Sequence, residues 1–195
     1  MLTGSGICIL FGMYGMVNQA VKGFVEENHG QEMWKNIHTK AGAPESFAAM
    51  SPYEDSITYN LVGAASELLN VPAEIILRGF GEYWVDKVAT AHYEAIMNKS
   101  GQNFVDFVKN LDHMHQRIRM TFPNYNPPSF RVKELSPDRL QVDYYSDRSG
   151  LLPFVEGLFT GLGRYYKTAV RIEHENAESL GLPCARMIVH HRPQT

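Results

Sequence analysis

Residues 129–146, SFRVKELSPDRLQVDYYS, decide the fold class of this chain. Apolar and polar side chains alternate in residues 129–135 and again in 139–146, which is the pattern of strands with one buried face. The Ser-Pro-Asp between the two segments is a turn signal, so we expect an antiparallel hairpin. Residues 168–175 (TAVRIEHE) and 185–192 (ARMIVHHR) alternate in the same way and predict a second pair of strands.

The chain before residue 129 shows helical periodicity instead, because its apolar residues recur at spacings of three and four. Residues 150–167, between the two strand pairs, return to that spacing. No internal repeat is visible. The order of segments predicts an α+β fold, in which a mostly helical N-terminal part is followed by a four-stranded antiparallel sheet with an inserted helix. The expected N-terminal helices cover residues 16–30, 31–42, 54–70, 71–89 and 103–119.

Particular residues predict where these helices begin or break and which of their side chains are buried. Gly30 should end or break the first helix, and Pro72 fits a first helical turn, where a missing N–H costs nothing. In residues 54–70, we expect Leu61, Ala65, Leu68 and Leu69 to point towards the core. In residues 71–89, the apolar stripe at i, i+4 spacing consists of Ile76, Phe80, Trp84 and Val88.

Composition narrows the function classes. The 195 residues are 44% hydrophobic and 20% charged with a formal net charge of −3, which suits one globular domain and argues against a general nucleic-acid binder. The two cysteines, Cys8 and Cys184, are too few for a disulfide framework and indicate a reducing cytoplasm. No basic residue precedes Lys22 and no run of about 20 apolar residues occurs, so we expect neither a secretory signal nor a membrane span.

Two histidines lie close together in NLDHMHQRIR, residues 110–119. His115 lies four residues after Leu111 and three before Ile118, so it points with the apolar stripe of its helix. His113 should face solvent. A buried imidazole needs partners for its ring nitrogens. The residues alone leave two alternatives open, namely a core histidine bonded to a nearby carbonyl and a ligand for a metal or haem.

A polar row follows in YYSDR, residues 144–148. In extended structure Tyr144, Ser146 and Arg148 would share one face and could bind carboxylates through two hydroxyls and a guanidinium. The alternative is a solvated strand end with an ordinary ion pair. Taken with His115 and the supply of apolar side chains, the row matches what a haem needs: an axial base, donors for its propionates and a dry pocket.

These motifs, in this order and spacing, resemble the H-NOX (haem nitric oxide/oxygen-binding) family, which includes the sensor domain of the soluble guanylate cyclase β subunit. The resemblance implies a single haem-binding domain over residues 13–195, preceded by an N-terminal extension of residues 1–12. It implies haem b (iron protoporphyrin IX), located between the helical part and the sheet. His115 would be the proximal iron ligand, Tyr144, Ser146 and Arg148 the propionate clamp, and Pro128 the residue that bends the porphyrin. The motifs that carry the resemblance are MYGMVNQAV (13–21), FGEYW (80–84), NLDHMH (110–115), PPSF (127–130) and YYSDR (144–148).

The resemblance also bears on the ligand. Bound dioxygen carries partial negative charge and gains much from a distal donor, which dioxygen-binding members supply as a tyrosine. Here the matching position is Phe154, or Pro153 if the alignment shifts by one residue, and neither can donate. With Val17 and Leu158 the wall is apolar, which favours nitric oxide and carbon monoxide. Trp84 is the exception, because its indole N–H could make this a dioxygen-binding sensor.

The resulting hypothesis is a stand-alone cytoplasmic gas sensor, not an enzyme. Nitric oxide would weaken the iron–His115 bond, the haem would relax against Pro128, and the signal would pass to a separate effector, a histidine kinase or a cyclic-di-GMP enzyme. Neither nucleic acid nor membrane is an expected partner. The rival hypotheses are the dioxygen sensor with Trp84 as donor, a haem-free metal hydrolase that uses Asp112, His113 and His115, and a haem-free interaction module.

Overall fold

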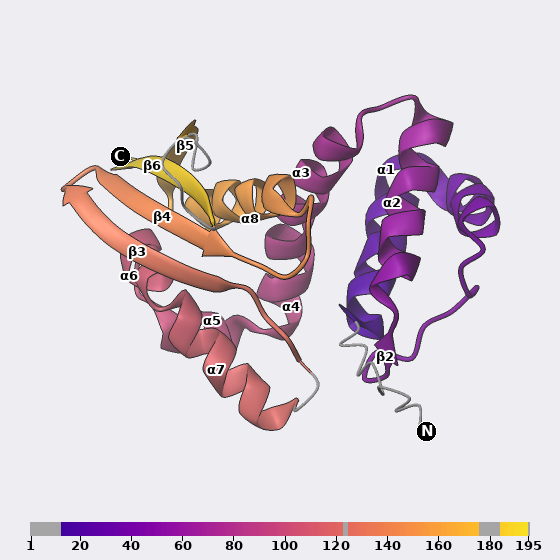
Figure 1. Cartoon of the computed structure of the whole chain (residues 1–195), viewed down its shortest axis with the longest axis horizontal. Coiled ribbons are helices and arrows are strands. Elements are labelled where there is room, and N and C mark those ends of the chain that lie inside the picture. The colour runs from indigo at the N-terminus through magenta and orange to yellow at the C-terminus, as the bar shows by residue number, and fades with distance from the viewer. Residues whose placement is uncertain (1–12, 123–124, 176–183, 195) are drawn as a thin grey trace, which may run out of the picture.

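The computed structural model describes residues 13–122, 125–175 and 184–194. The predicted N-terminal extension, residues 1–12, lies outside the described residues. Helices α1 (Gly15–Ala41) and α2 (Asp55–Leu69) form one side of the molecule, and the sheet with its covering helices forms the other (Figure 1). Helices α3 (Ala73–Tyr83) and α8 (Leu152–Tyr165) pack against each other between the two sides.

The sheet follows the order β3-β4-β6-β5, and all neighbouring strands are antiparallel. Val132, Val142 and Met187 occupy paired positions across three strands, and the last two are fully buried. Helix α8 is inserted between β4 and β5. The α+β prediction is therefore confirmed. The strands are β3 (Ser129–Ser136), β4 (Arg139–Tyr145), β5 (Thr168–Glu175) and β6 (Ala185–Pro193).

The prediction of one long helix over residues 103–119 is wrong. Two helices occupy this stretch, α6 (Phe104–Lys109) and α7 (Leu111–Thr121), because Asn110 between them leaves the helical conformation at φ −97° and ψ 5°. The Asn103 side chain caps α6 by accepting a hydrogen bond of 2.9 Å from the Asp106 N–H. The predictions also missed α4 (Thr90–His92), α5 (Glu94–Ser100) and a two-residue pairing of β1 (Met13–Tyr14) with β2 (Pro52–Tyr53).

Helices α1 and α2 largely follow their predicted patterns. Gly30 has φ 82° and ψ 166°, so it breaks α1 as expected, in a conformation that favours glycine. Leu61 and Ala65 of α2 are buried, but Leu68 is 41% exposed and does not reach the core as predicted. The prediction from i+3 and i+4 spacing is therefore wrong for Leu68, which lies beside the buried face of α2 and not within it.

Helix α3 passes directly into a π-helix, η1 (Trp84–Ala89), and its partner α8 lies unusually close. A Cβ built at Gly157 of α8 would overlap the Arg78 carbonyl oxygen, so only glycine permits this approach. Within the described residues the buried apolar side chains form two clusters, one in the α1–α3 half and one beneath the sheet, and Trp84 packs against both.

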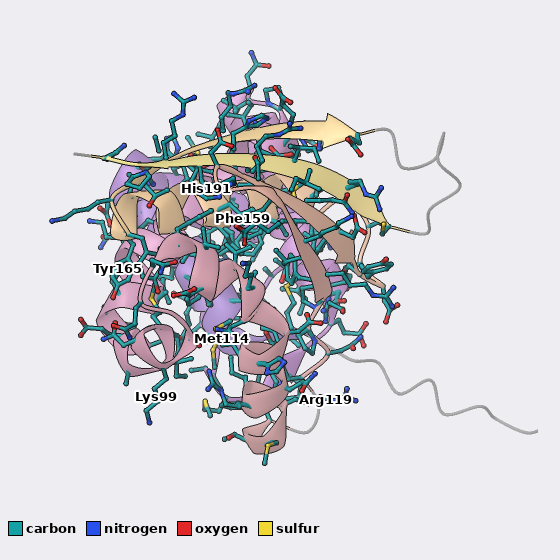
Figure 2. The ribbon with its side chains drawn as sticks, turned by 90° about the vertical axis from the view of Figure 1, so that its left-hand side faces the viewer. Lys99, Met114, Arg119, Phe159, Tyr165 and His191 are labelled. Carbon is teal, nitrogen blue, oxygen red and sulfur yellow. The ribbon has the colours of Figure 1, made fainter. Side chains whose placement is uncertain are left out.

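The cluster beneath the sheet contains Phe159 of α8, and Met114 of α7 packs against it (Figure 2). The strands cover this cluster on one side, and α6, α7 and α8 cover it on the other. Helix α7 is thereby fixed at the edge of an apolar interior, which places its inward-facing side chains next to the sheet. Within the described part of the chain, no helix combines the length and apolar character needed to cross a membrane.

Candidate haem site

His115 lies on the inner side of α7 and His113 is exposed, as predicted. The His115 Nδ1 is 3.2 Å from the Pro128 carbonyl oxygen, and the ring lies 5.9 Å from that of Phe130 and 6.1 Å from that of Tyr125. A carbonyl can only accept, so Nδ1 carries the hydrogen and Nε2 presents a lone pair. Among the described residues Nε2 has no hydrogen-bond partner. This is the state in which a histidine binds a metal.

Acidification is expected to destabilise the chain through His115. Burial lowers the pKa of His115 from its ordinary value of 6.5, outweighing the opposite effects of the Pro128 carbonyl and Asp112. When the pH falls below 6.5, His115 becomes protonated in the unfolded chain but stays neutral in the folded chain. The free energy of unfolding therefore decreases with falling pH, until the pH reaches the lowered pKa of the folded state. Denaturant unfolding of wild type and His115→Gln at about pH 7.5 and pH 5.5 measures this. Between these two pH values the wild type should lose more stability than the variant. Equal losses would show that His115 is not the source of the pH dependence.

Asp112 ties α7 to the sheet. Its carboxylate accepts a hydrogen bond of 2.6 Å from the Phe130 N–H and one of 3.0 Å from the Ser129 hydroxyl. Both donors begin strand β3, directly after Pro128. The carboxylate is therefore occupied by one side-chain and one backbone donor at the start of β3. This does not favour the metal-hydrolase hypothesis, which needs Asp112, His113 and His115 to converge.

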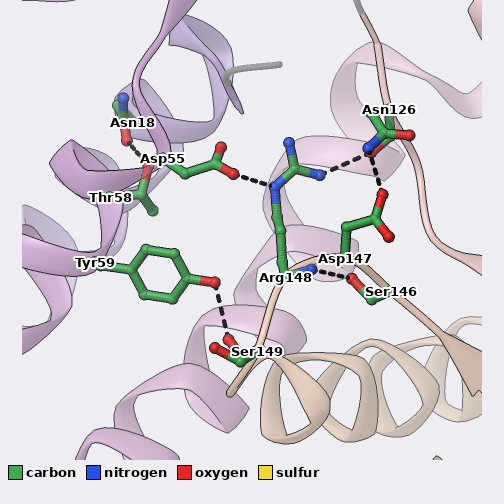
Figure 3. A network of polar contacts seen from close by, with 9 residues as sticks. All are labelled: Asn18, Asp55, Thr58, Tyr59, Asn126, Ser146, Asp147, Arg148 and Ser149. Carbon is green, nitrogen blue, oxygen red and sulfur yellow. Dashed lines mark hydrogen bonds and ion pairs between the residues drawn. The ribbon is translucent and has the colours of Figure 1, made fainter. Parts of the chain in front are cut away.

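Arg148 forms the centre of the second part of the site (Figure 3). Its Nε donates to Asp55 Oδ2 at 2.7 Å and its Nη1 donates to the Asn126 carbonyl at 2.7 Å. Its backbone N–H donates to the Ser146 hydroxyl at 3.1 Å. Strand β4 ends at Tyr145, so Ser146 and Arg148 lie in the following loop and do not share a strand face with Tyr144 as expected. The Ser146 side chain nevertheless interacts with that of Tyr144. Tyr144 itself is buried at 6% exposure.

The same loop contacts helix α2 at a second place. The Tyr59 hydroxyl donates to the Ser149 carbonyl at 2.8 Å, next to the Arg148–Asp55 ion pair (Figure 3). These contacts join the helical half of the molecule to the end of the sheet. Sequence reasoning missed Asp55 and Tyr59, because both follow ordinary helical patterns about 90 residues away from the loop they contact.

The predicted distal residues pack against one or both of the two apolar clusters. Val17 and Phe154 pack against the α1–α3 cluster, Leu158 packs against the cluster beneath the sheet, and Trp84 packs against both. Phe154 stacks on Phe80 with ring centroids 5.2 Å apart. Pro153, the alternative to Phe154, lies in the first turn of α8. Among these residues only Trp84 offers a hydrogen-bond donor on its side chain.

Known proteins are similar to this chain in sequence. A family model described as Haem-NO-binding matches residues 14–174. Soluble guanylate cyclase gcy-33 of Caenorhabditis elegans is 30% identical over 163 residues, which are 83% of this chain and 17% of that protein. The chain spans about a quarter or less of the length of the first curated relatives, at 17%, 23% and 25%.

Solved structures give the same result for the fold. An H-NOX protein from S. oneidensis in the Fe(II) ligation state has a TM-score of 0.82 at 20% identity, covering 94% of this chain and 98% of that chain. An H-NOX protein from S. oneidensis in the Fe(II)NO ligation state has a TM-score of 0.81 at 19% identity, covering 92% and 99%. At these identities the likeness establishes the fold alone.

Proposed function

Because the chain belongs to the Haem-NO-binding (H-NOX) family, whose members bind haem and which is not a catalytic family, we propose that it senses nitric oxide through a ferrous haem. The family match confirms the resemblance drawn from the sequence motifs. The proposal adds the type of haem, the residues that hold it, the preferred ligand and the route of the signal.

The observation that carries the proposal is the state of His115. The Pro128 carbonyl holds Nδ1, and the unshared pair of Nε2 has no partner among the described residues. The ring is only partly buried, and the contact at Nδ1 leaves Nε2 as the nitrogen that can bind a metal. Haem would supply an iron able to bind both such a nitrogen and a diatomic gas. We assign haem b because the chain lacks the CxxCH motif that attaches c-type haem.

The loop after β4 supplies the groups that would hold the propionates. Arg148 is partly buried, with 14% of its side chain exposed, and its charge acts on the buried Tyr144 phenol by lowering the pKa of that group against the larger effect of burial. Ser146 offers a hydroxyl in the same loop. Arg148 pairs with Asp55 in this structure, so the carboxylate preorganises the guanidinium for a charge-assisted contact. Pro128, whose carbonyl holds His115, is the residue that we propose presses on the porphyrin.

The distal wall supports nitric oxide and carbon monoxide as ligands. Val17, Phe154 and Leu158 have no donor to stabilise a partial negative charge on a bound gas, and Pro153 has none either. Dioxygen depends on such a donor more than nitric oxide does. An apolar wall therefore favours the complexes with nitric oxide and carbon monoxide over the complex with dioxygen.

Helix α7 provides the route for the signal. It carries His115, and Asp112 couples it to β3 through two hydrogen bonds. Weakening of the iron–His115 bond would free α7 to shift relative to Pro128, which is the two-state element that a sensor requires. We propose that residues 13–195 act as one cytoplasmic domain and pass this shift to a separate effector, a histidine kinase or a cyclic-di-GMP enzyme.

One observation favours a second candidate, a dioxygen sensor that uses Trp84. The Trp84 Nε1 donates no hydrogen bond to any described residue, although the side chain packs against both clusters. An indole N–H that is half-buried and without an acceptor is available to a polar ligand.

Absorption spectra of the reduced, haem-loaded protein discriminate between the two candidates. Nitric oxide and carbon monoxide are each expected to shift the haem bands, and air-saturated buffer is expected to give no lasting complex. A dioxygen complex that persists in the wild type and is lost in Trp84→Phe would establish the second candidate instead. Protein that takes up no haem at all would rule out both.

A further inference from the structure

The π-helix η1 places Trp84 at the point where the geometry of its helix changes. Tyr83, Trp84, Ala89 and Thr90 all have helical φ and ψ, so the helix runs on without a break and only its turn widens. π turns are rare, occur as short insertions in α-helices and are often found at functional sites. Trp84 is the first residue of this one.

The wide turn keeps two rows of side chains facing inward. In an α-helix, positions four apart drift around the axis by about 40° per step. The i→i+5 turn rotates less per residue, so Trp84 and Val88 stay in line with Phe80, and Val85 and Ala89 remain buried beside them. The Trp84 ring meets Phe80 edge-on, with centroids 6.3 Å apart.

Arg164 of α8 bridges the junction between the α and π segments. Its Nη1 donates to Glu82 Oε2 at 2.8 Å, and its Nη2 donates to Asp86 Oδ2 at 2.7 Å. Glu82 lies in the last turn of α3 and Asp86 in η1, so the two carboxylates flank Trp84. Like charges at i, i+4 repel each other on a helix, and the guanidinium fork offsets this repulsion with defined geometry.

Helix α8 lies close enough to η1 for the Arg164 guanidinium to restrict the position of η1. A Cβ built at Gly161, three residues before Arg164, would lie 2.8 Å from Val85 Cβ. Helix α8 also carries Phe154 and Leu158, which we place on the distal wall. A shift of η1 against α8 would therefore change the position of Trp84 relative to that wall.

We infer that Arg164 is a positioning residue, which fixes the direction of the Trp84 indole N–H in the haem pocket by holding Glu82 and Asp86 on either side of the α–π junction. The inference rests on the proposed haem site and on the Trp84 N–H facing its ligand, which the dioxygen-sensor candidate also requires. Arg164 touches neither haem nor ligand, and it acts through Trp84 on how a bound gas is polarised.

The test compares Arg164→Gln with Lys87→Gln in the reduced, carbon monoxide-treated, haem-loaded full chain. Lys87 is the matched control, because it lies in η1 and forms an exposed ion pair with Glu27 at 2.6 Å that does not bridge the junction. ¹⁵N labelling gives two indole N–H signals, since Trp34 and Trp84 are the two tryptophans. Trp84→Phe assigns them, and the infrared C–O stretching band reports the polarity that the ligand meets.

Arg164→Gln is expected to shift the Trp84 indole signal, leave that of Trp34 in place and move the C–O band in the same direction as Trp84→Phe. Asp86→Asn, which keeps the Glu82 contact, should move both in the same direction and covers the case in which Arg164→Gln folds poorly. Unchanged signals in Arg164→Gln, or equal changes in Lys87→Gln, would overturn the inference. If Trp84→Phe moves no C–O band, the inference fails while the haem site stands. Protein without haem would overturn the proposed function as well.

Discussion

Replacement of His115 by glycine is expected to abolish haem retention, and free imidazole added during expression or reconstitution is expected to restore it. The change removes the ring whose Nε2 is free while Pro128 holds Nδ1. Imidazole can occupy the vacated space and bind iron from the same side. The ratio of haem absorbance to protein absorbance after purification measures the effect.

His113→Gly is the matched control for that experiment. His113 lies two residues away on the same helix and is exposed, so its loss carries the same helical penalty of about 1 kcal/mol without touching the site. It should retain haem at the wild-type ratio. Undiminished haem in His115→Gly, or equal losses in both variants, would contradict the assignment of the ligand.

Gly157→Ala is expected to lower the free energy of unfolding by about 1–3 kcal/mol, because it overpacks the contact between α3 and α8. The added Cβ would overlap the Arg78 carbonyl oxygen, and neither helix can yield without moving the side chains that the other carries. Glu156, the preceding residue, pairs with Arg78 across the same contact and leaves still less room for adjustment. Denaturant unfolding of the purified protein measures the change.

Gly63→Ala provides a control of the opposite sign. Gly63 lies within α2, and a Cβ there would meet nothing within 4 Å. Alanine is the better helix former by about 0.8–1 kcal/mol, so this variant should gain stability. A loss in Gly63→Ala similar to that in Gly157→Ala would show that the close approach of α3 and α8 is not the cause.

The sequence predicted the parts of the fold that depend on local periodicity. The alternation in residues 129–135 and 185–192 located two strands of the sheet, because a period of two is hard to mistake when one face is buried. It did not predict the break at Asn110 or the π-helix at Trp84, since apolar residues keep helical spacing through both. Such features depend on tertiary packing, which periodicity does not record.

In the candidate site, too, the sequence predicted what depends on local spacing and missed what depends on contacts between distant segments. The inward direction of His115 follows from its spacing to Leu111 and Ile118. Its contact with Pro128 and the pairing of Arg148 with Asp55 join segments from different parts of the chain. No local pattern marks Asp55 as a partner, because an acidic residue in the first turn of a helix already has a sufficient reason to be there.

The most direct measurement is a crystal structure of the reduced, haem-loaded protein. We expect His115 Nε2 to coordinate the iron and Nδ1 to keep its hydrogen bond to the Pro128 carbonyl. Val17, Phe154 and Leu158 should lie on the opposite face of the porphyrin. Iron bound by any other side chain, or haem located away from the meeting point of the two apolar clusters, would contradict this expectation.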